Sequence, residues 1–103
     1  MSKIDQHFVG KYSIIRTYSA GNWAGVVSAQ EGCKIILTNA RRLWRWKCNK
    51  GISLSSIATY GVDHNQSKIP CAVTEVFLEA IEIIPATEIA EKTIVEAPEC
   101  HAE

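Results

Sequence analysis

Basic and aromatic side chains alternate over one short segment, residues 39–47 (N-A-R-R-L-W-R-W-K). Four of its nine residues are Arg or Lys, two are Trp, and none is acidic. A guanidinium is a planar fork of hydrogen-bond donors that fits phosphate oxygens. An indole ring is a flat surface on which a nucleobase stacks, at about 1–3 kcal/mol per base. The segment therefore predicts a site for a small phosphate-bearing ligand such as a nucleotide.

Each residue type in this segment has its own predicted role. The arginines would contact phosphate, one tryptophan would stack on a base, and the amide of Asn39 would read a base edge. Arg16 would add a secondary contact if the first strands lie beside the segment. The candidate ligand-binding residues are Arg41, Arg42, Arg45, Trp44, Trp46, Asn39 and Arg16.

The same residues have a second interpretation as parts of the fold. Large aromatic residues usually form the core of a chain as short as 103 residues, so Trp44 and Trp46 are also core candidates. In that case Arg41 and Arg45 would form a solvated outer face or a salt-bridge surface between subunits. Both interpretations remain open at the level of the sequence.

Motifs for catalysis and metal binding are missing from the sequence. It contains no phosphate-binding loop, no nucleophile elbow, no zinc-protease motif and no dinucleotide-binding fingerprint. No nucleophile accompanies its three histidines, so we expect neither an enzyme nor a cofactor. The cysteines lie too far apart for a zinc site, and we expect reduced thiols, most of them buried. They are Cys33, Cys48, Cys71 and Cys100.

Charge is divided unevenly along a chain whose formal net charge is zero. Residues 1–68 carry ten Lys or Arg and three acids, whereas residues 69–103 carry eight Glu and one Lys. Opposite halves of this kind can attract each other within a chain or between chains. Together with the apolar stretch 76–84, this pattern predicts a homo-oligomer.

The pattern of apolar residues predicts an α+β fold, a small antiparallel sheet of four to five strands with two short helices. Ser53 and Thr87 are good N-cap residues for helices over 53–61 and 88–95. Residues 72–84 favour a strand through their Val, Phe and Ile content, with a helix as the alternative. The expected strands are residues 11–20, 23–29, 33–38, 41–47 and 72–84.

The length of 103 residues suits one hydrophobic core, so we expect a single domain over residues 1–103 with an ordered core at about 8–97. No window approaches the roughly 18 apolar residues of a membrane span. The polar start, residues 1–7, lacks the apolar stretch of a signal peptide. We therefore expect a protein that stays in the cytosol where it is made and has no membrane partner.

Three motifs in order resemble a family of small proteins encoded by tailed phages and prophages. They are R-T-Y-S-A-G at residues 16–21, N-A-R-R-L-W at 39–44 and E-A-I-E-I-I-P at 79–85. The resemblance covers roughly residues 13–95 and implies a phage setting with action in the host cytoplasm. Members mostly have no assigned function, so it supplies no site residues. The family has Cys where Ala86 stands here, so a role for that cysteine would not apply.

Three functions therefore compete. The leading hypothesis is a non-catalytic phage protein that sequesters a nucleotide signal of bacterial anti-phage defence. The second is a protein–protein module, either an inhibitor of a host protein or a minor virion component. The third is a nucleic-acid-binding accessory protein, which the neutral overall charge disfavours because such domains are usually basic.

Overall fold

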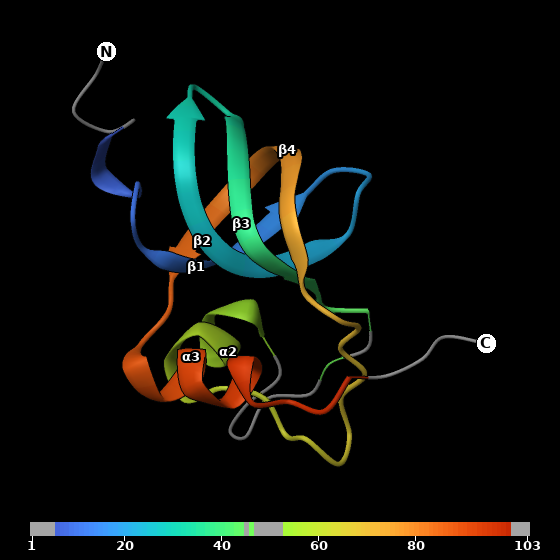
Figure 1. The fold of residues 1–103 in the computed structure, drawn as a ribbon. Helices are drawn as coiled ribbons and strands as arrows, with labels where there is room; N and C mark the ends of the chain where they lie inside the picture. The colour runs from blue at the N-terminus through green and yellow to red at the C-terminus, as the bar shows by residue number, and fades with distance from the viewer. Residues whose placement is uncertain (1–5, 45, 47–52, 100–103) are drawn as a thin grey trace.

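The computed structural model describes residues 6–44, 46 and 53–99. Its centre is a closed antiparallel barrel in which β4 pairs with both β3 and β1 (Figure 1). The predicted α+β domain with an antiparallel sheet and two short helices is confirmed. The elements are β1 (Tyr12–Thr17), β2 (Asn22–Glu31), β3 (Lys34–Arg42), α2 (Leu54–Tyr60), β4 (Val73–Pro85) and α3 (Glu88–Val95).

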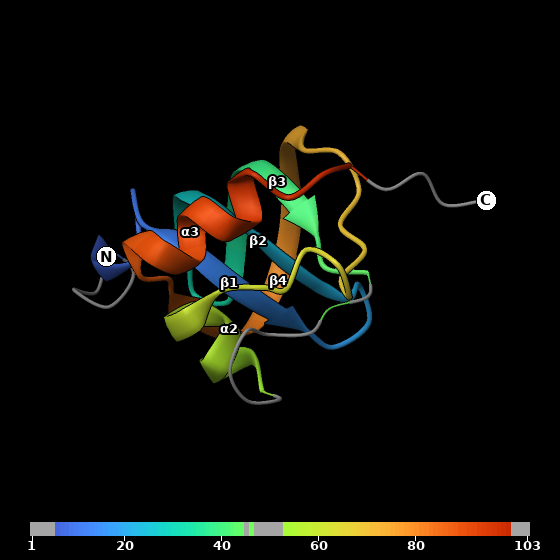
Figure 2. The same cartoon turned by 90° about the horizontal axis from the view of Figure 1, so that it is seen from below.

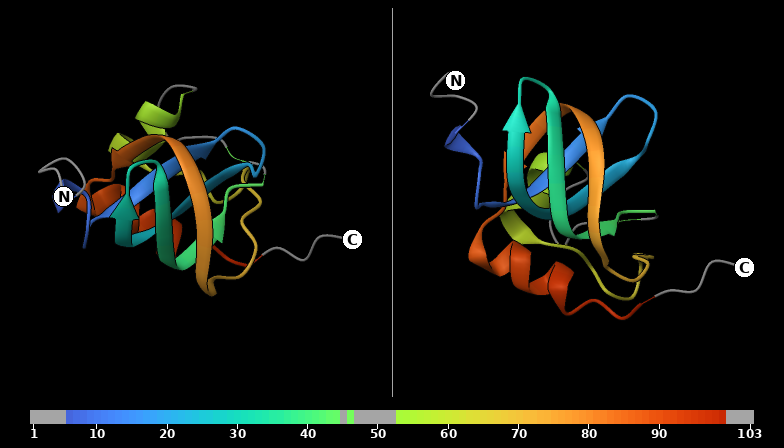
Figure 3. Two further views of the ribbon diagram at one scale, coloured as in Figure 1. Left: turned by 90° about the horizontal axis from the view of Figure 1, so that it is seen from above. Right: turned by 45° about the horizontal axis from the view of Figure 1, so that its top comes forward.

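Strand β4 is long and bent, and it closes the barrel. Its first half pairs with β3, as in Phe77 opposite Ile36, and its second half pairs with β1, as in Ile83 opposite Ile15. One extra residue, Ile81, interrupts the pairing with β1 and lets the strand turn across the barrel (Figure 3). The strand prediction for residues 72–84 is confirmed, and the helix alternative is wrong because two strands satisfy its backbone.

Strand β3 runs through the point where the sequence suggested a break. Asn39 takes a left-handed conformation (φ 49°), and β3 gains one residue relative to β2 there. The predicted strand 41–47 is therefore wrong, because its first two residues belong to β3. Gly25 lies opposite this bulge, where a Cβ would stand 2.8 Å from the Thr38 carbonyl oxygen. A side chain at position 25 would therefore collide with the backbone of β3.

In the first hairpin, β1 is shorter than the predicted strand 11–20 and β2 is longer than the predicted strand 23–29. β1 ends at Thr17 rather than at residue 20 because the Thr17 side chain closes a loop. Its hydroxyl donates to the Gly21 carbonyl at 2.7 Å and accepts from the Ala20 amide at 2.9 Å. Gly21 completes the turn with a φ of 84°. Tyr18 is left at the tip, with 92% of its surface exposed.

The strands carry buried apolar side chains on both faces, and these side chains form two hydrophobic clusters. Successive strand residues point to opposite faces, so neighbours such as Ile14 and Ile15 enter different clusters. The interior of the barrel holds Ile15, Trp23, Val27, Ile35, Leu37, Ala40, Leu78 and Ala80. The second cluster lies between the strands and the two helices, and it consists of Tyr12, Ile14, Ala24, Leu43, Ile57, Ala58, Val62, Ile69, Ile94 and Ala97.

The two helices lie together on one side of the barrel (Figure 2). Each begins at the predicted cap, since Ser53 Oγ accepts from the Ser56 amide and Thr87 Oγ1 accepts from the Ala90 amide. Thr87 Oγ1 also donates to the Thr59 carbonyl at 2.8 Å, which ties α3 to the end of α2. Within the residues that the structure describes, no helix is both long and apolar enough to cross a membrane.

Candidate ligand-binding surfaces

Arg41 is part of the fold and not of a ligand site. It is 5% exposed, because this position of β3 faces the helices. Its guanidinium donates four hydrogen bonds of 2.7–2.9 Å to backbone carbonyls. The prediction that Arg41 contacts phosphate is therefore wrong, since its donors are already used within the fold. The accepting carbonyls belong to Ile69, Pro70, Ile94 and Ala97.

Arg42 points to the opposite face of β3 and is exposed. Its guanidinium carbon lies 4.6 Å from the ring centroid of Trp23, its cross-strand neighbour. Trp23 is buried, and its indole nitrogen donates to the Ala20 carbonyl at 3.0 Å. A guanidinium stacked on an aromatic face keeps its N–H donors at its edge. Arg42 is thus held beside Trp23, and no hydrogen bond joins its guanidinium to another described residue.

The two tryptophans of the segment have different environments. Trp44 is 53% exposed, and the Lys68 ammonium lies 5.9 Å from its ring centroid. Trp46 is partly buried against the helix-side cluster, as the core interpretation expects. Base stacking therefore stays open for Trp44 and is disfavoured for Trp46. Arg45 lies outside the described residues.

Arg16 and Asn39 are not brought together with Arg42. Arg16 Nε donates to Glu82 Oε1 at 3.1 Å, forming an exposed ion pair across β1 and β4. Asn39 lies on the helix side of β3, at the edge of a cavity beside α3. The predicted site is therefore divided among separate surfaces of the barrel.

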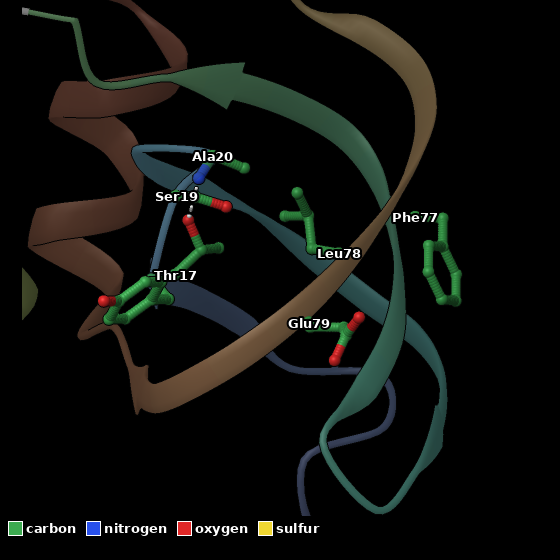
Figure 4. Close-up of a pocket in the computed structure, with 7 residues that line it drawn as sticks. Thr17, Ser19, Ala20, Phe77, Leu78 and Glu79 are labelled. Atoms are coloured by element: carbon green, nitrogen blue, oxygen red, sulfur yellow. Dashed lines mark hydrogen bonds between the residues drawn. The ribbon is translucent and has the colours of Figure 1, made fainter.

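A cleft of about 390 Å³ opens where β1 and β4 part. The last β1–β4 pair joins Thr17 to Ala80, while β4 continues along β3 alone. Residues 17–20 of the loop line one side and residues 77–79 of β4 line the other (Figure 4). Ala20, which lines the cleft, accepts a hydrogen bond from the indole of Trp23, the ring that Arg42 lies over. Neither the cleft nor the position of Lys68 was predicted from the sequence, because both depend on contacts between distant segments.

A second cavity, of about 300 Å³, lies between β3 and α3. The Tyr12 hydroxyl is buried here and has no hydrogen-bond partner among the described residues. Burial raises the pKa of Tyr12 well above its ordinary value. The negative charge of Glu91 adds to the rise, and Arg41 opposes it. Tyr12 therefore stays a neutral hydroxyl at physiological pH.

Comparison with known families shows which family the chain belongs to. Residues 10–94 match the family described as Domain of unknown function (DUF6948). The chain belongs to the DUF6948 family. No curated protein and no solved structure matches it. The matched residues include all four strands, α2 and all but the last residue of α3, so the family match spans the whole barrel.

The titratable side chains of the DUF6948 chain are scattered. In the part of the chain that the structure describes, no group of three or more His, Cys, Asp or Glu could hold a metal ion. His64 Nε2 lies 2.7 Å from the Thr93 carbonyl, a backbone group. Cys33 and Cys71 are exposed free thiols, so the expected burial is wrong for these two. Cys48 and Cys100 lie outside the described residues.

Proposed function

We propose that this DUF6948 protein is a non-catalytic binding protein that captures a small phosphate-bearing ligand, such as a nucleotide signal of anti-phage defence. One observation carries the proposal, the exposed Arg42 guanidinium that lies over the ring of Trp23, whose indole donates to Ala20 in the wall of the cleft. The mouth of a small barrel is a recurrent place for ligand sites. The resemblance to phage-encoded proteins supports action in the host cytoplasm.

The ligand contacts follow from the chemistry of the exposed side chains. Arg42 donates to phosphate oxygens from the edge of its stacked guanidinium. Two exposed rings, Tyr18 at the loop tip and Trp44 after β3, are available to stack on a base. Lys68 adds a second cation next to Trp44. Of these proposed contact residues, Arg42 and Trp44 were candidates from the sequence, whereas Tyr18 and Lys68 come from the structure.

Capture without turnover fits the residues around the cleft. Among its described lining residues, Glu79 is the only titratable group besides the Tyr18 phenol. A hydrolase of phosphate esters needs a positioned base with a nucleophile or a metal. We therefore expect the ligand to be released unchanged.

A titration against nucleotides, with cyclic dinucleotides included, tests the proposal. The wild-type protein should bind one class, and Arg42→Gln should bind it at least tenfold more weakly, since losing one charged hydrogen bond costs about 1.5–3 kcal/mol. Arg16→Gln is the matched control, because Arg16 is exposed but paired with Glu82. Equal binding by Arg42→Gln, or chemical conversion of the bound ligand, would contradict the proposal.

Self-association is a second candidate function, favoured by one apolar surface. Phe77 is 61% exposed on the outer face of β4, across from Ile36. Phe77 lines a hollow of about 280 Å³ together with apolar and polar side chains of β2 and β3, which are Ala29, Ile35, Ile36, Gln30, Glu31 and Lys34. A second copy related by a two-fold axis could place its own Phe77 in this hollow, with Lys34 near the partner's acidic β4. The same face could instead bind a host protein.

A further inference from the structure

The cavity between β3 and α3 brings together polar groups from three elements. Tyr12 comes from the start of β1, Asn39 from the β3 bulge and Glu91 from the first turn of α3. Apolar walls complete it, with Val26 and Val95 among them. The cavity is separate from the cleft at the barrel mouth, and its lining shares no residue with that cleft.

The Tyr12 hydroxyl is the first sign of a binding site here. The residue is 8% exposed, and its oxygen has no hydrogen-bond partner among the described residues. Folded proteins rarely leave a buried hydroxyl unpaired, because its lost hydration is not replaced. Because this oxygen has less than 1 Å² of accessible surface, a ligand in the cavity reaches it only when the surrounding side chains move apart, and it then supplies the missing partner.

Asn39 and Glu91 are the second sign. Asn39 is held in the left-handed conformation by the bulge, and its side chain is exposed at the cavity edge. Glu91 is half buried. No side-chain hydrogen bond joins either residue to another described residue. One amide and one carboxylate therefore border the same space with their hydrogen-bonding capacity unused.

The charged side chains that line the cavity limit the kinds of ligand that it can bind. Arg41 lines the cavity, but its guanidinium is committed to four backbone carbonyls. No other cationic side chain lines the cavity among the described residues. Arg41 keeps its positive charge, but most of its N–H donors are already used, so a phosphate would meet the Glu91 carboxylate without a bidentate hydrogen-bond partner. The cavity suits an uncharged ligand that donates hydrogen bonds.

We propose that this cavity binds an amino-substituted nitrogen heterocycle of the kind found in adenine and cytosine. Glu91 accepts from the exocyclic amine, and the Asn39 amide pairs with the neighbouring ring edge, as Glu and Asn do when they recognise cytosine and adenine. The Tyr12 hydroxyl donates to a ring acceptor. Val26 and Val95 contact the faces of the ring. The proposal does not depend on phosphate contacts at Arg42.

Nucleosides test this site separately, because they carry no phosphate. Isotope-labelled protein would be titrated with adenosine and cytidine, and with inosine and uridine, which lack the exocyclic amine. We expect adenosine or cytidine to shift the NMR signals of the Asn39 side-chain amide and of residues 12 and 91. Inosine and uridine should bind at least tenfold more weakly. If neither amino nucleoside shifts these signals at millimolar concentration, the proposal is overturned.

Tyr12→Phe separates binding from folding. It removes the hydroxyl and keeps the ring, so binding of the amino nucleoside should fall at least fivefold while the melting temperature stays equal or rises. Glu91→Gln should weaken binding at least tenfold, and Glu96→Gln, on the exposed end of α3, is the control. A lower melting temperature for Tyr12→Phe would contradict the proposal, since the hydroxyl would then serve the fold. A negative result in these tests would leave the proposal for the Arg42 site standing. A negative result for Arg42→Gln would likewise leave the proposal for this cavity standing.

Discussion

Arginine has different roles on the side of the barrel that the helices cover and on the side that they leave open. On the covered side, Arg41 donates to four backbone carbonyls and is almost fully buried. One residue further along β3, Arg42 is exposed and touches the ring of Trp23. Arg41 therefore joins β3 to other segments of the fold, whereas no hydrogen bond joins the Arg42 guanidinium to another described residue. Neighbouring positions on a strand therefore differ in role because they face different sides.

The largest expected effect is on the covered side, at Arg41. Replacing it by Met removes all four hydrogen bonds that join β3 to residues 69–70 and to the segment at the end of α3, so the free energy of unfolding should fall by about 3–5 kcal/mol. Urea denaturation measures the change. Arg42→Met is the control and should cost less than about 1 kcal/mol, because its site is exposed. Equal losses would remove the distinction between the two sides.

The next effect is on the open side, at Phe77. If a second copy covers this face, Phe77→Glu should weaken self-association at least 30-fold, or about 2 kcal/mol, with little change in monomer stability. Sedimentation velocity over a range of concentrations measures this. Ile89→Glu is the control, because Ile89 is equally apolar and 69% exposed on α3. A wild-type protein that stays monomeric at high concentration would rule out the dimer.

The alkaline stability of the fold reports on the buried Tyr12. Its pKa is raised in the folded state by burial, so the unfolded chain loses this proton first, near pH 10. The unfolded state then binds fewer protons, and stability should fall by about 1.4 kcal/mol per pH unit above that point. Tyr12→Phe should remove this part of the pH dependence. Tyr18→Phe, at the exposed loop tip, is the control, and identical curves for all three proteins would contradict the assignment.

The smallest expected effect is at the exposed ion pair of Arg16 and Glu82. Both side chains are about half exposed, so solvent and salt screen their attraction. Arg16→Gln should reduce the free energy of unfolding by less than about 1 kcal/mol, and 1 M salt should remove most of the difference. A loss comparable to that of Arg41→Met would show that this part of the open side also holds the fold.

Local signals in the sequence predicted the elements well. The caps Ser53 and Thr87 and the β-branched residues of β4 reappear in the structure. The bulge at Asn39 was not predictable in the same way, because its left-handed conformation depends on the opposing Gly25 and the pairing of β2 with β3. That bulge turned an expected strand break into a continuous strand.

The candidate sites were harder to predict because their residues meet only in the folded chain. Nothing near Arg41 in the sequence shows that carbonyls from residues 69–70 and from the end of α3 will surround it. Lys68 is an isolated lysine until it lies beside Trp44. Tyr12 and Glu91 are 79 positions apart and line one cavity. The basic and aromatic segment therefore predicted phosphate binding but could not show that Arg41 is committed to the fold while Arg42 is exposed.

The most direct test follows the side-chain Nε–H signals of the arginines by NMR while a cyclic dinucleotide or another bound nucleotide is added. Our account predicts that the Arg42 signal moves with saturation. The Arg41 signal should stay in place and exchange slowly with solvent, because its donors are buried in hydrogen bonds. Movement of the Arg41 signal, or no movement of Arg42 at ligand saturation, would contradict the assignment of structure to one arginine and binding to the other.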